Sequence, residues 1–113
     1  LPNEEKEFVL SCGLDGCLSV YPKEGFDKLV EKMSQFDFLD DKKRAFVRLT
    51  SGSAMPIGLD SHGRISIGKD IAERFSLSGS VTVIGALDHF EIWNVALYEK
   101  YLLKSSLGLG GIN

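Results

Sequence analysis

The sequence predicts an α+β fold built from two similar halves, and three observations carry this prediction. The segment FVLSCGLDGCLSVYP alternates apolar and polar residues on both sides of Asp15-Gly16, which is typical of a β-hairpin. The residues after it have an apolar periodicity that favours an amphipathic helix. Both patterns return in VTVIGALDHFEIWN and the residues that follow it. Such self-similarity is a property of a whole fold, so we expect an internal duplication.

Two helices are expected in the first half. Pro22 opens the first, whose apolar residues recur at spacings of three and four: Phe26, Leu29, Val30 and Met33. Asp40 and Asp41 supply an N-cap and a favourable charge for the second helix, which continues through about Arg48 and ends near Gly52.

In the second half we expect a strand over 53–59, a turn over 60–64, a strand over 65–67 and a short helix over about 69–75. The second hairpin follows, offset from the first by 73 residues before its turn and by 72 after it. The helix after it repeats as well, with Tyr98, Tyr101 and Leu102 in the places of Phe26, Leu29 and Val30.

The offset defines the expected domain boundaries. The counterpart of Asp60 would precede Leu1, so we expect a first repeat over 1–52 that lacks its first strand and turn but includes a helical linker. The second repeat is expected over 53–104. Residues 105–113 (SSLGLGGIN) have the composition of a flexible tail, although Leu107, Leu109 and Ile112 could dock on a neighbour.

Composition narrows the function classes. With 113 residues, 43% of them hydrophobic, the chain suits one soluble domain. No apolar run approaches the roughly 18 to 20 residues that a membrane helix needs, and we expect a cytoplasmic protein. The net charge of −3 has the wrong sign for bulk electrostatic binding of nucleic acid. Binding to DNA would require a local patch multiplied by assembly.

The turn LDSHGR carries more chemistry than a chain reversal needs. Asp60 can accept hydrogen bonds from backbone N–H groups of the turn, and Gly63 permits a positive φ. Arg64 can then pair with Asp60 or point outward. In the first case Asp60 and Arg64 only stabilise the turn, and His62 is solvated. In the second, a rigidly held arginine suits contact with guanine edges or phosphates.

These motifs resemble the MraZ family. The resemblance rests on GLDGCLSVYP in the first half, and on LDSHGRISI followed by VIGALDHFEIWN in the second. It implies two AbrB-like repeats of the swapped-hairpin type that form a pseudo-symmetric β-barrel with peripheral helices, the first repeat being incomplete at its N-terminus. Two departures from the family pattern are the absence of a first Asp-x-x-Gly-Arg motif and Gly68, where the family commonly has proline.

The resemblance also implies a function. A member of this family is expected to be a bacterial transcriptional regulator and a repressor of the division and cell-wall gene cluster. It would be a ring-shaped homo-oligomer, associated with the nucleoid, that binds double-stranded DNA at direct repeats upstream of its own operon. We expect Arg64 to contact DNA with His62 and Lys69 in support, while Asp60 and Gly63 shape the turn. No catalytic residue, metal, cofactor or small-molecule substrate is expected.

Several other interpretations are weaker. DSHGR resembles the Asp-Ser/Thr-Gly turn of aspartic proteases only in part, because His62 interrupts it. The cysteines Cys12 and Cys17 and the histidines His62 and His89 lack a zinc-ligand spacing. The basic cluster Lys42, Lys43, Arg44 and Arg48 favours a solvated or subunit-contacting face over direct contact with DNA. Tyr21 and Trp93, equivalent in the two repeats, favour packing over base stacking. The competing function is an oligomeric scaffold that binds a protein partner instead of DNA.

Overall fold

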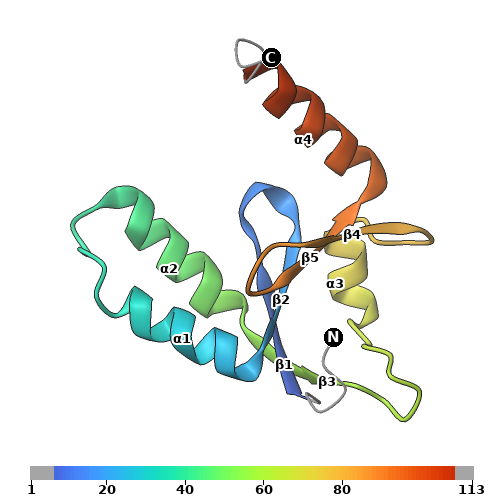
Figure 1. Ribbon diagram of the computed structural model, residues 1–113, viewed down its shortest axis with the longest axis horizontal. Coiled ribbons are helices and arrows are strands. Elements are labelled where there is room, and N and C mark those ends of the chain that lie inside the picture. Colours follow the sequence, from blue (N-terminus) through green and yellow to red (C-terminus); the bar gives the residue numbers. More distant parts are fainter. Residues whose placement is uncertain (1–6, 109–113) are drawn as a thin grey trace.

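An antiparallel sheet of five strands forms the centre of the molecule (Figure 1). The computed structural model describes residues 7–108. The strands β1 (Glu7–Cys12), β2 (Leu18–Pro22), β3 (Met55–Gly58), β4 (Val81–Gly85) and β5 (Phe90–Asn94) lie in the order β3-β1-β2-β5-β4. The helices are α1 (Lys23–Met33), α2 (Asp41–Ser53), α3 (Lys69–Arg74) and α4 (Val95–Gly108), and the short 3-10 helix η1 (Leu14–Gly16) connects β1 and β2. The predicted α+β class is confirmed.

Side chains cap the starts of two helices, α2 and α4. The carboxylate of Asp40 accepts a hydrogen bond of 3.0 Å from the backbone N–H of Lys43, which caps α2 as the sequence predicts. The side-chain oxygen of Asn94 accepts one of 2.9 Å from the N–H of Leu97 at the start of α4. In Figure 1, α1 and α2 lie together on one side of the strands and α3 on the other, while α4 projects away from the sheet.

The two predicted hairpins are confirmed and pair in equivalent registers. Cys12 lies opposite Leu18 at the end of the β1–β2 hairpin, and Gly85 lies opposite Phe90 at the end of the β4–β5 hairpin. The connecting residues are 13–17 in the first hairpin and 86–89 in the second. The second connection is one residue shorter, which explains why the offset between the repeats falls from 73 to 72 residues across the turn. The aromatic pairs match too: Tyr21 meets Phe26 edge-on at 5.7 Å, and Trp93 meets Tyr98 at 5.2 Å.

The hairpins meet symmetrically through β2 and β5. Ser19 pairs with Glu91, its own repeat equivalent, and the flanking pairs are Leu18 with Ile92 and Val20 with Phe90. Because the flanking pairs exchange equivalent positions, a local two-fold axis relates the hairpins and passes through the Ser19–Glu91 pair. The order β1-β2-β5-β4 is therefore palindromic, and β3 is added beside β1.

Alternation along the strands divides the sheet into two faces. One face carries the hydrophobic core, formed by Phe8, Leu10, Leu18, Val20 and Ile92 together with Leu77. Ile71, Ala72 and Phe75, in and just after α3, pack against this core. The opposite face holds the alternate residues of the same strands, among them Ser11, Ser19, Tyr21, Glu91 and Trp93.

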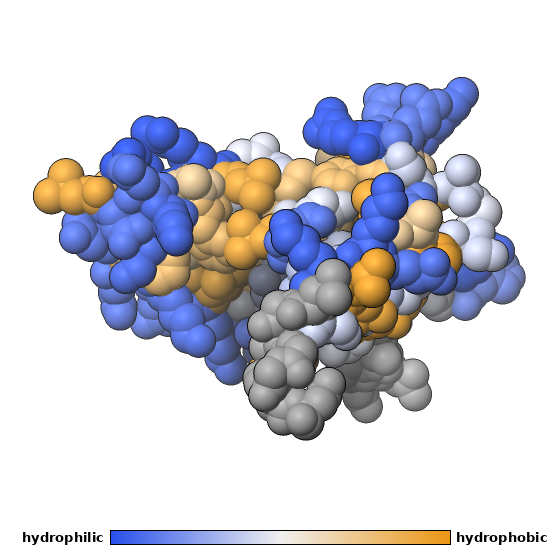
Figure 2. Space-filling model, turned by 90° about the horizontal axis from the view of Figure 1, so that it is seen from above, coloured by the Kyte–Doolittle hydropathy of each residue, from blue (hydrophilic) through white to orange (hydrophobic). Residues whose placement is uncertain are grey.

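Equivalent core positions in the two hairpins differ in burial. Phe8 and Leu10 of β1 are each 1% exposed, whereas their repeat equivalents in β4, Val81 and Val83, are 37% and 59% exposed. β3 pairs with β1 and its Ile57 packs against the core, whereas among residues 7–108 no strand pairs with the outer edge of β4. Apolar side chains reach the surface between hydrophilic regions of the molecule (Figure 2).

The β-barrel stays a prediction, because within the described residues the sheet has two edges and is not closed. Two other expectations need correction. The strand expected over 65–67 is wrong: only Ile65 forms an isolated bridge, to Leu59, because the backbone then turns into α3 through Gly68 with a φ of +83°. The start of the expected tail is helical, since α4 continues to Gly108. Leu109 and Ile112 lie outside the described residues, and so does the side chain of Leu107.

Candidate nucleic-acid interface

Asp60 organises the turn between β3 and α3. One oxygen of its carboxylate, Oδ1, accepts hydrogen bonds from the backbone N–H groups of His62 (2.8 Å) and Arg64 (2.9 Å). Backbone bonds from Gly63 N–H to the Asp60 carbonyl (3.0 Å) and from Asp60 N–H to the Arg64 carbonyl (2.9 Å) close the turn. Gly63 has a φ of +75°, which glycine adopts without strain. Asp60 and Gly63 thus stand at the points that fix the backbone path.

The side chain of Arg64 combines both arrangements that the sequence left open. Its Nε donates to Oδ2 of Asp60 at 3.2 Å, and its terminal amino group lies 3.4 Å from Nδ1 of His62. The side chain nevertheless remains 73% exposed. The neighbouring carboxylate therefore orients the guanidinium while leaving donors directed to solvent.

Hydrogen bonds to the ionised carboxylate lower the pKa of Asp60 below its ordinary value. The backbone N–H of Arg64 is the largest cause, and the N–H of His62 and the Arg64 side chain add to it. A carboxylate held in its charged form keeps the turn closed and its arginine paired across the neutral pH range.

Lys69 is not part of this hydrogen-bonded group. It is exposed at the start of α3, directly after Gly68. Within residues 7–108, no hydrogen bond or ion pair joins Lys69 to the turn. The structure therefore brings Asp60, His62 and Arg64 together and leaves Lys69 as a separate exposed cation.

The basic cluster predicted at the start of α2 is engaged locally. Arg44 donates to Asp41 at 2.7 Å and to the carbonyl of Phe38 at 2.9 Å. The Lys43 ammonium lies 5.7 Å from the centre of the Phe36 ring, and the Arg48 guanidinium 5.9 Å from that of Phe38. These contacts hold the connection between α1 and α2.

A polar cluster that the sequence analysis missed lies on the sheet face opposite the core. The His89 ring stacks on Tyr21 with centroids 4.4 Å apart, and its Nδ1 lies 2.8 Å from the Asp88 carboxylate. Its Nε2 lies 3.7 Å from Glu91, which accepts a hydrogen bond of 2.9 Å from the Trp93 indole. The one available signal was the alternation that puts Ser11, Ser19 and Glu91 on the non-core face.

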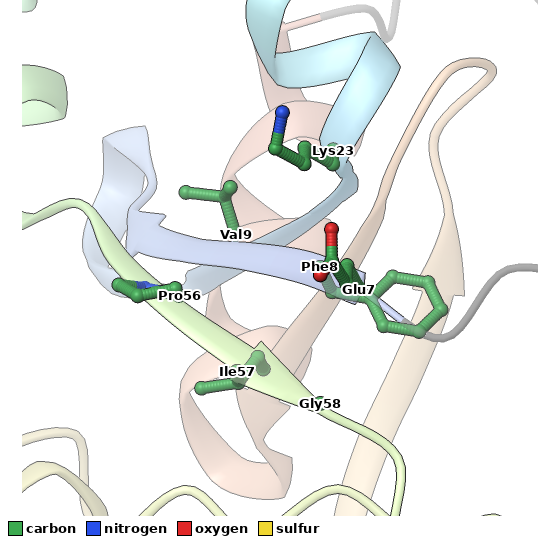
Figure 3. Close-up of a pocket in the computed structure, with 7 residues that line it drawn as sticks. All are labelled: Glu7, Phe8, Val9, Lys23, Pro56, Ile57 and Gly58. Atoms are coloured by element: carbon green, nitrogen blue, oxygen red, sulfur yellow. The ribbon is translucent and has the colours of Figure 1, made fainter.

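A cavity of about 400 Å³ lies where β1 and β3 meet the start of α1. Figure 3 shows Lys23 above Val9 of β1, with Pro56 and Ile57 on the neighbouring β3. Among the described lining residues, Glu7 and Lys23 are the charged ones. The cavity contains none of the predicted site residues and offers no chemistry beyond an apolar groove.

The described residues give little basis for other chemistry. The carboxylate of Asp60 accepts three hydrogen bonds, all from residues of its own turn, and these bonds stabilise the turn. Within residues 7–108, no group of three or more His, Cys, Asp and Glu side chains is arranged to hold a metal ion. Cys12 and Cys17 are both free thiols. No helix in this part of the chain is long and apolar enough to cross a membrane.

Comparison with known proteins extends over most of the chain. The family model described as "MraZ protein, putative antitoxin-like" matches residues 3–49 and 52–109. The protein named transcriptional regulator MraZ of Heliobacterium modesticaldum is 38% identical over 99 residues, which cover 88% of this chain and 69% of the relative.

Two further relatives carry the same name. That of Moorella thermoacetica is 35% identical over 100 residues, covering 88% of this chain and 70% of its own. That of Pediococcus pentosaceus is 36% identical over 96 residues, which cover 85% of this chain and 67% of the relative. The similarity thus includes both hairpins and the Asp60–Arg64 turn.

Proposed function

This chain belongs to the MraZ family, and from that premise we propose that it is a sequence-specific DNA-binding transcriptional regulator. The observation that carries the proposal is the family match over residues 3–49 and 52–109, together with relatives named transcriptional regulators. The finer proposal is a cytoplasmic, nucleoid-associated repressor of the division and cell-wall gene cluster. It acts on direct repeats upstream of its own operon.

In this proposal the Asp60–Arg64 turn is the DNA-reading element. Arg64 contacts a base edge or a phosphate, because its guanidinium is held by Asp60 and still 73% exposed. His62 and the exposed Lys69 support that contact, and Asp60 and Gly63 fix the turn. The acids Asp70 and Glu73 offset the cations of α3, so one turn binds weakly and affinity comes from several turns acting together.

The proposed assembly is a ring-shaped homo-oligomer of subunits with two AbrB-like repeats, over 1–52 and 53–104. Support comes from the palindromic order of the sheet and from the exposure of Val83 on its core face. Closing the sheet into a barrel would cover that side chain. Light scattering at micromolar concentration and moderate salt checks the assembly, and a monomeric mass contradicts it.

The second candidate function is a scaffold that binds a protein partner without contacting DNA. The apolar surface of α4 favours it, since Leu97, Leu102 and Leu103 are exposed. The net charge of −3 is in line with this alternative. A gel-shift assay of the protein with its own upstream DNA against random DNA, over a range of salt concentrations, separates the two. No mobility shift on either DNA favours the scaffold, and equal shifts on both show binding without sequence specificity.

The residue-level test is Arg64→Ala. The Asp60–Arg64 pair is exposed, so the variant stays folded. We expect its affinity for the upstream repeats to fall by about 1–3 kcal/mol per engaged site, with a smaller loss on random DNA. The measurement is the ratio of the two affinities at one fixed salt concentration, with melting curves of both proteins.

The matched control is Arg74→Ala, which removes a cation from the last turn of α3. Because this arginine lies outside the turn, the ratio should stay close to that of the parent protein. An unchanged ratio in Arg64→Ala, or equal loss in both variants, removes Arg64 as the source of specificity.

A further inference from the structure

A cavity of about 290 Å³ lies between the non-core face of the sheet and α2. Both hairpins and α2 line it, with Ser11 and Tyr21 from the first hairpin, His89 and Glu91 from the second, and Thr50 from α2. Ser19, at the local two-fold axis, lines it as well. The volume is close to the lower end of the range for small-molecule sites, about 300–1,000 Å³.

Three hydroxyl groups line this cavity and have no hydrogen-bond partner among residues 7–108. Ser11, Ser19 and Thr50 are 2%, 4% and 2% exposed. Among the described residues, none of these hydroxyls makes a hydrogen bond, and no buried side-chain nitrogen or oxygen is sealed off without a partner. Each hydroxyl oxygen therefore reaches accessible space, and all three residues line the same cavity. Their donors and acceptors are free to exchange hydrogen bonds with a molecule bound there.

The charge of the lining selects the kind of occupant. Glu91 and Asp15 bring carboxylates to the cavity, and Asp88 lies just behind His89. No Lys or Arg is among the described lining residues. An anion would be repelled here, whereas a cation gains from the carboxylates.

We propose that this cavity binds a small organic ammonium compound that also carries a hydroxyl group. The carboxylate of Glu91 accepts hydrogen bonds from the ammonium, and Ser11, Ser19 and Thr50 bind the hydroxyl. Glu91 is already oriented, because its Oε1 accepts the indole N–H of Trp93 at 2.9 Å. Occupancy joins both hairpins to α2, so the compound stabilises the folded chain.

Trp93 makes the test direct. It is the single tryptophan of the chain, and its indole contacts the carboxylate that receives the ammonium. The probes are three molecules of similar length: 4-amino-1-butanol (cationic), 1,4-butanediol (neutral) and 4-hydroxybutyrate (anionic). We expect only the first to change Trp93 fluorescence saturably and to raise the melting temperature. The other two should bind at least about tenfold more weakly.

Two variants locate the site. Glu91→Gln keeps an acceptor for the Trp93 indole but removes the charge, and should weaken 4-amino-1-butanol at least about tenfold. Thr50→Val keeps the side-chain shape and removes a hydroxyl, and should weaken it severalfold. If circular dichroism shows that Glu91→Gln is unfolded, Thr50→Val decides.

The matched control is Glu99→Gln, the same charge change on an exposed residue of α4 outside the cavity. It should leave binding unchanged. Three results overturn the proposal: no saturable response to 4-amino-1-butanol up to about 50 mM, equal responses to all three probes, or equal weakening by Glu99→Gln and Glu91→Gln. Binding unaffected by Thr50→Val overturns the role of the hydroxyls.

Discussion

Ser19 of β2 lies directly opposite Glu91 of β5, and these two residues occupy equivalent positions of the two hairpins. A residue facing its own equivalent marks a two-fold axis, so the sheet is organised as two hairpins turned about this point. Departures from the symmetry are therefore informative. At such positions, equivalent residues of the two hairpins have different neighbours.

Leu10 and Val83 are one such pair. Leu10 is buried in the core, and Val83 is mostly exposed. Leu10→Ala should lower the free energy of unfolding by about 2–5 kcal/mol, because it leaves a cavity. In the monomer, Val83→Ala should change it by no more than about 0.5 kcal/mol, whereas an assembly that covers Val83 should make the loss larger. Urea denaturation of both variants checks this, and a large loss in Val83→Ala would show that the residue is buried in solution.

Gly68 has a φ of +83° as the chain enters α3, although a Cβ there would meet no atom within 4 Å. Gly68→Ala should therefore lower the free energy of unfolding by about 1–3 kcal/mol through backbone strain alone. Gly52, in α2, also has open space around it but no positive φ. Gly52→Ala serves as the control and should raise stability by about 0.5–1 kcal/mol. Equal changes in the free energy of unfolding for the two variants would show that Gly68 is not under backbone strain.

Leu87 is a fully exposed leucine with a φ of +66° in the β4–β5 connection. A left-handed conformation is costly for leucine and better tolerated by asparagine. Leu87→Asn should therefore raise the free energy of unfolding by about 1 kcal/mol. Leu97→Asn, within α4, should lower it, since asparagine is a poor helix former. Thermal melts of the two variants should move in opposite directions.

The pKa of Asp60 is lowered in the folded state from its ordinary value of 3.8, chiefly by the Arg64 backbone N–H. A lowered folded pKa contributes stability above the unfolded value, and this contribution is lost as the pH falls through the folded pKa. Asp60→Asn should thus lower the melting temperature at pH 7 by a few degrees, and the difference from the parent should shrink in acid. For Glu99→Gln, the difference in melting temperature from the parent should not depend on pH in this way. If the difference for Asp60→Asn stays constant as the pH falls, the Asp60 carboxylate does not contribute stability through its lowered pKa.

Burial, followed by the charge of Glu91, raises the pKa of the Cys17 thiol to about 12. Cys12 is partly exposed. Since the thiolate is the reactive form, Cys12 should react first with a thiol reagent in the native protein. In Cys12→Ser, labelling of Cys17 should be nearly absent until urea unfolds the chain. Rapid native labelling in that variant would show that Cys17 is accessible.

The sequence predicts what depends on neighbouring residues. Both hairpins, the cap at Asp40 and the closed turn at Asp60 follow from local patterns, and all are present. The strand expected over 65–67 failed because the backbone of Gly68 diverts the chain, which the apolar alternation of Ile65 and Ile67 does not reveal. The cavity of Ser19, Thr50 and Glu91 could not be predicted, because its residues meet only through tertiary packing.

The outer edge of β4 has a consequence for the behaviour of the chain in concentrated solution. The strand reads VTVIG, with no charged residue and no proline, and among residues 7–108 no strand covers its outer hydrogen-bonding groups. Natural edge strands usually carry charges, prolines or bulges that block edge-to-edge pairing. An apolar β-branched strand without them is a template for amyloid-like stacking. A lysine in place of Val83 would act as a gatekeeper there and slow aggregation.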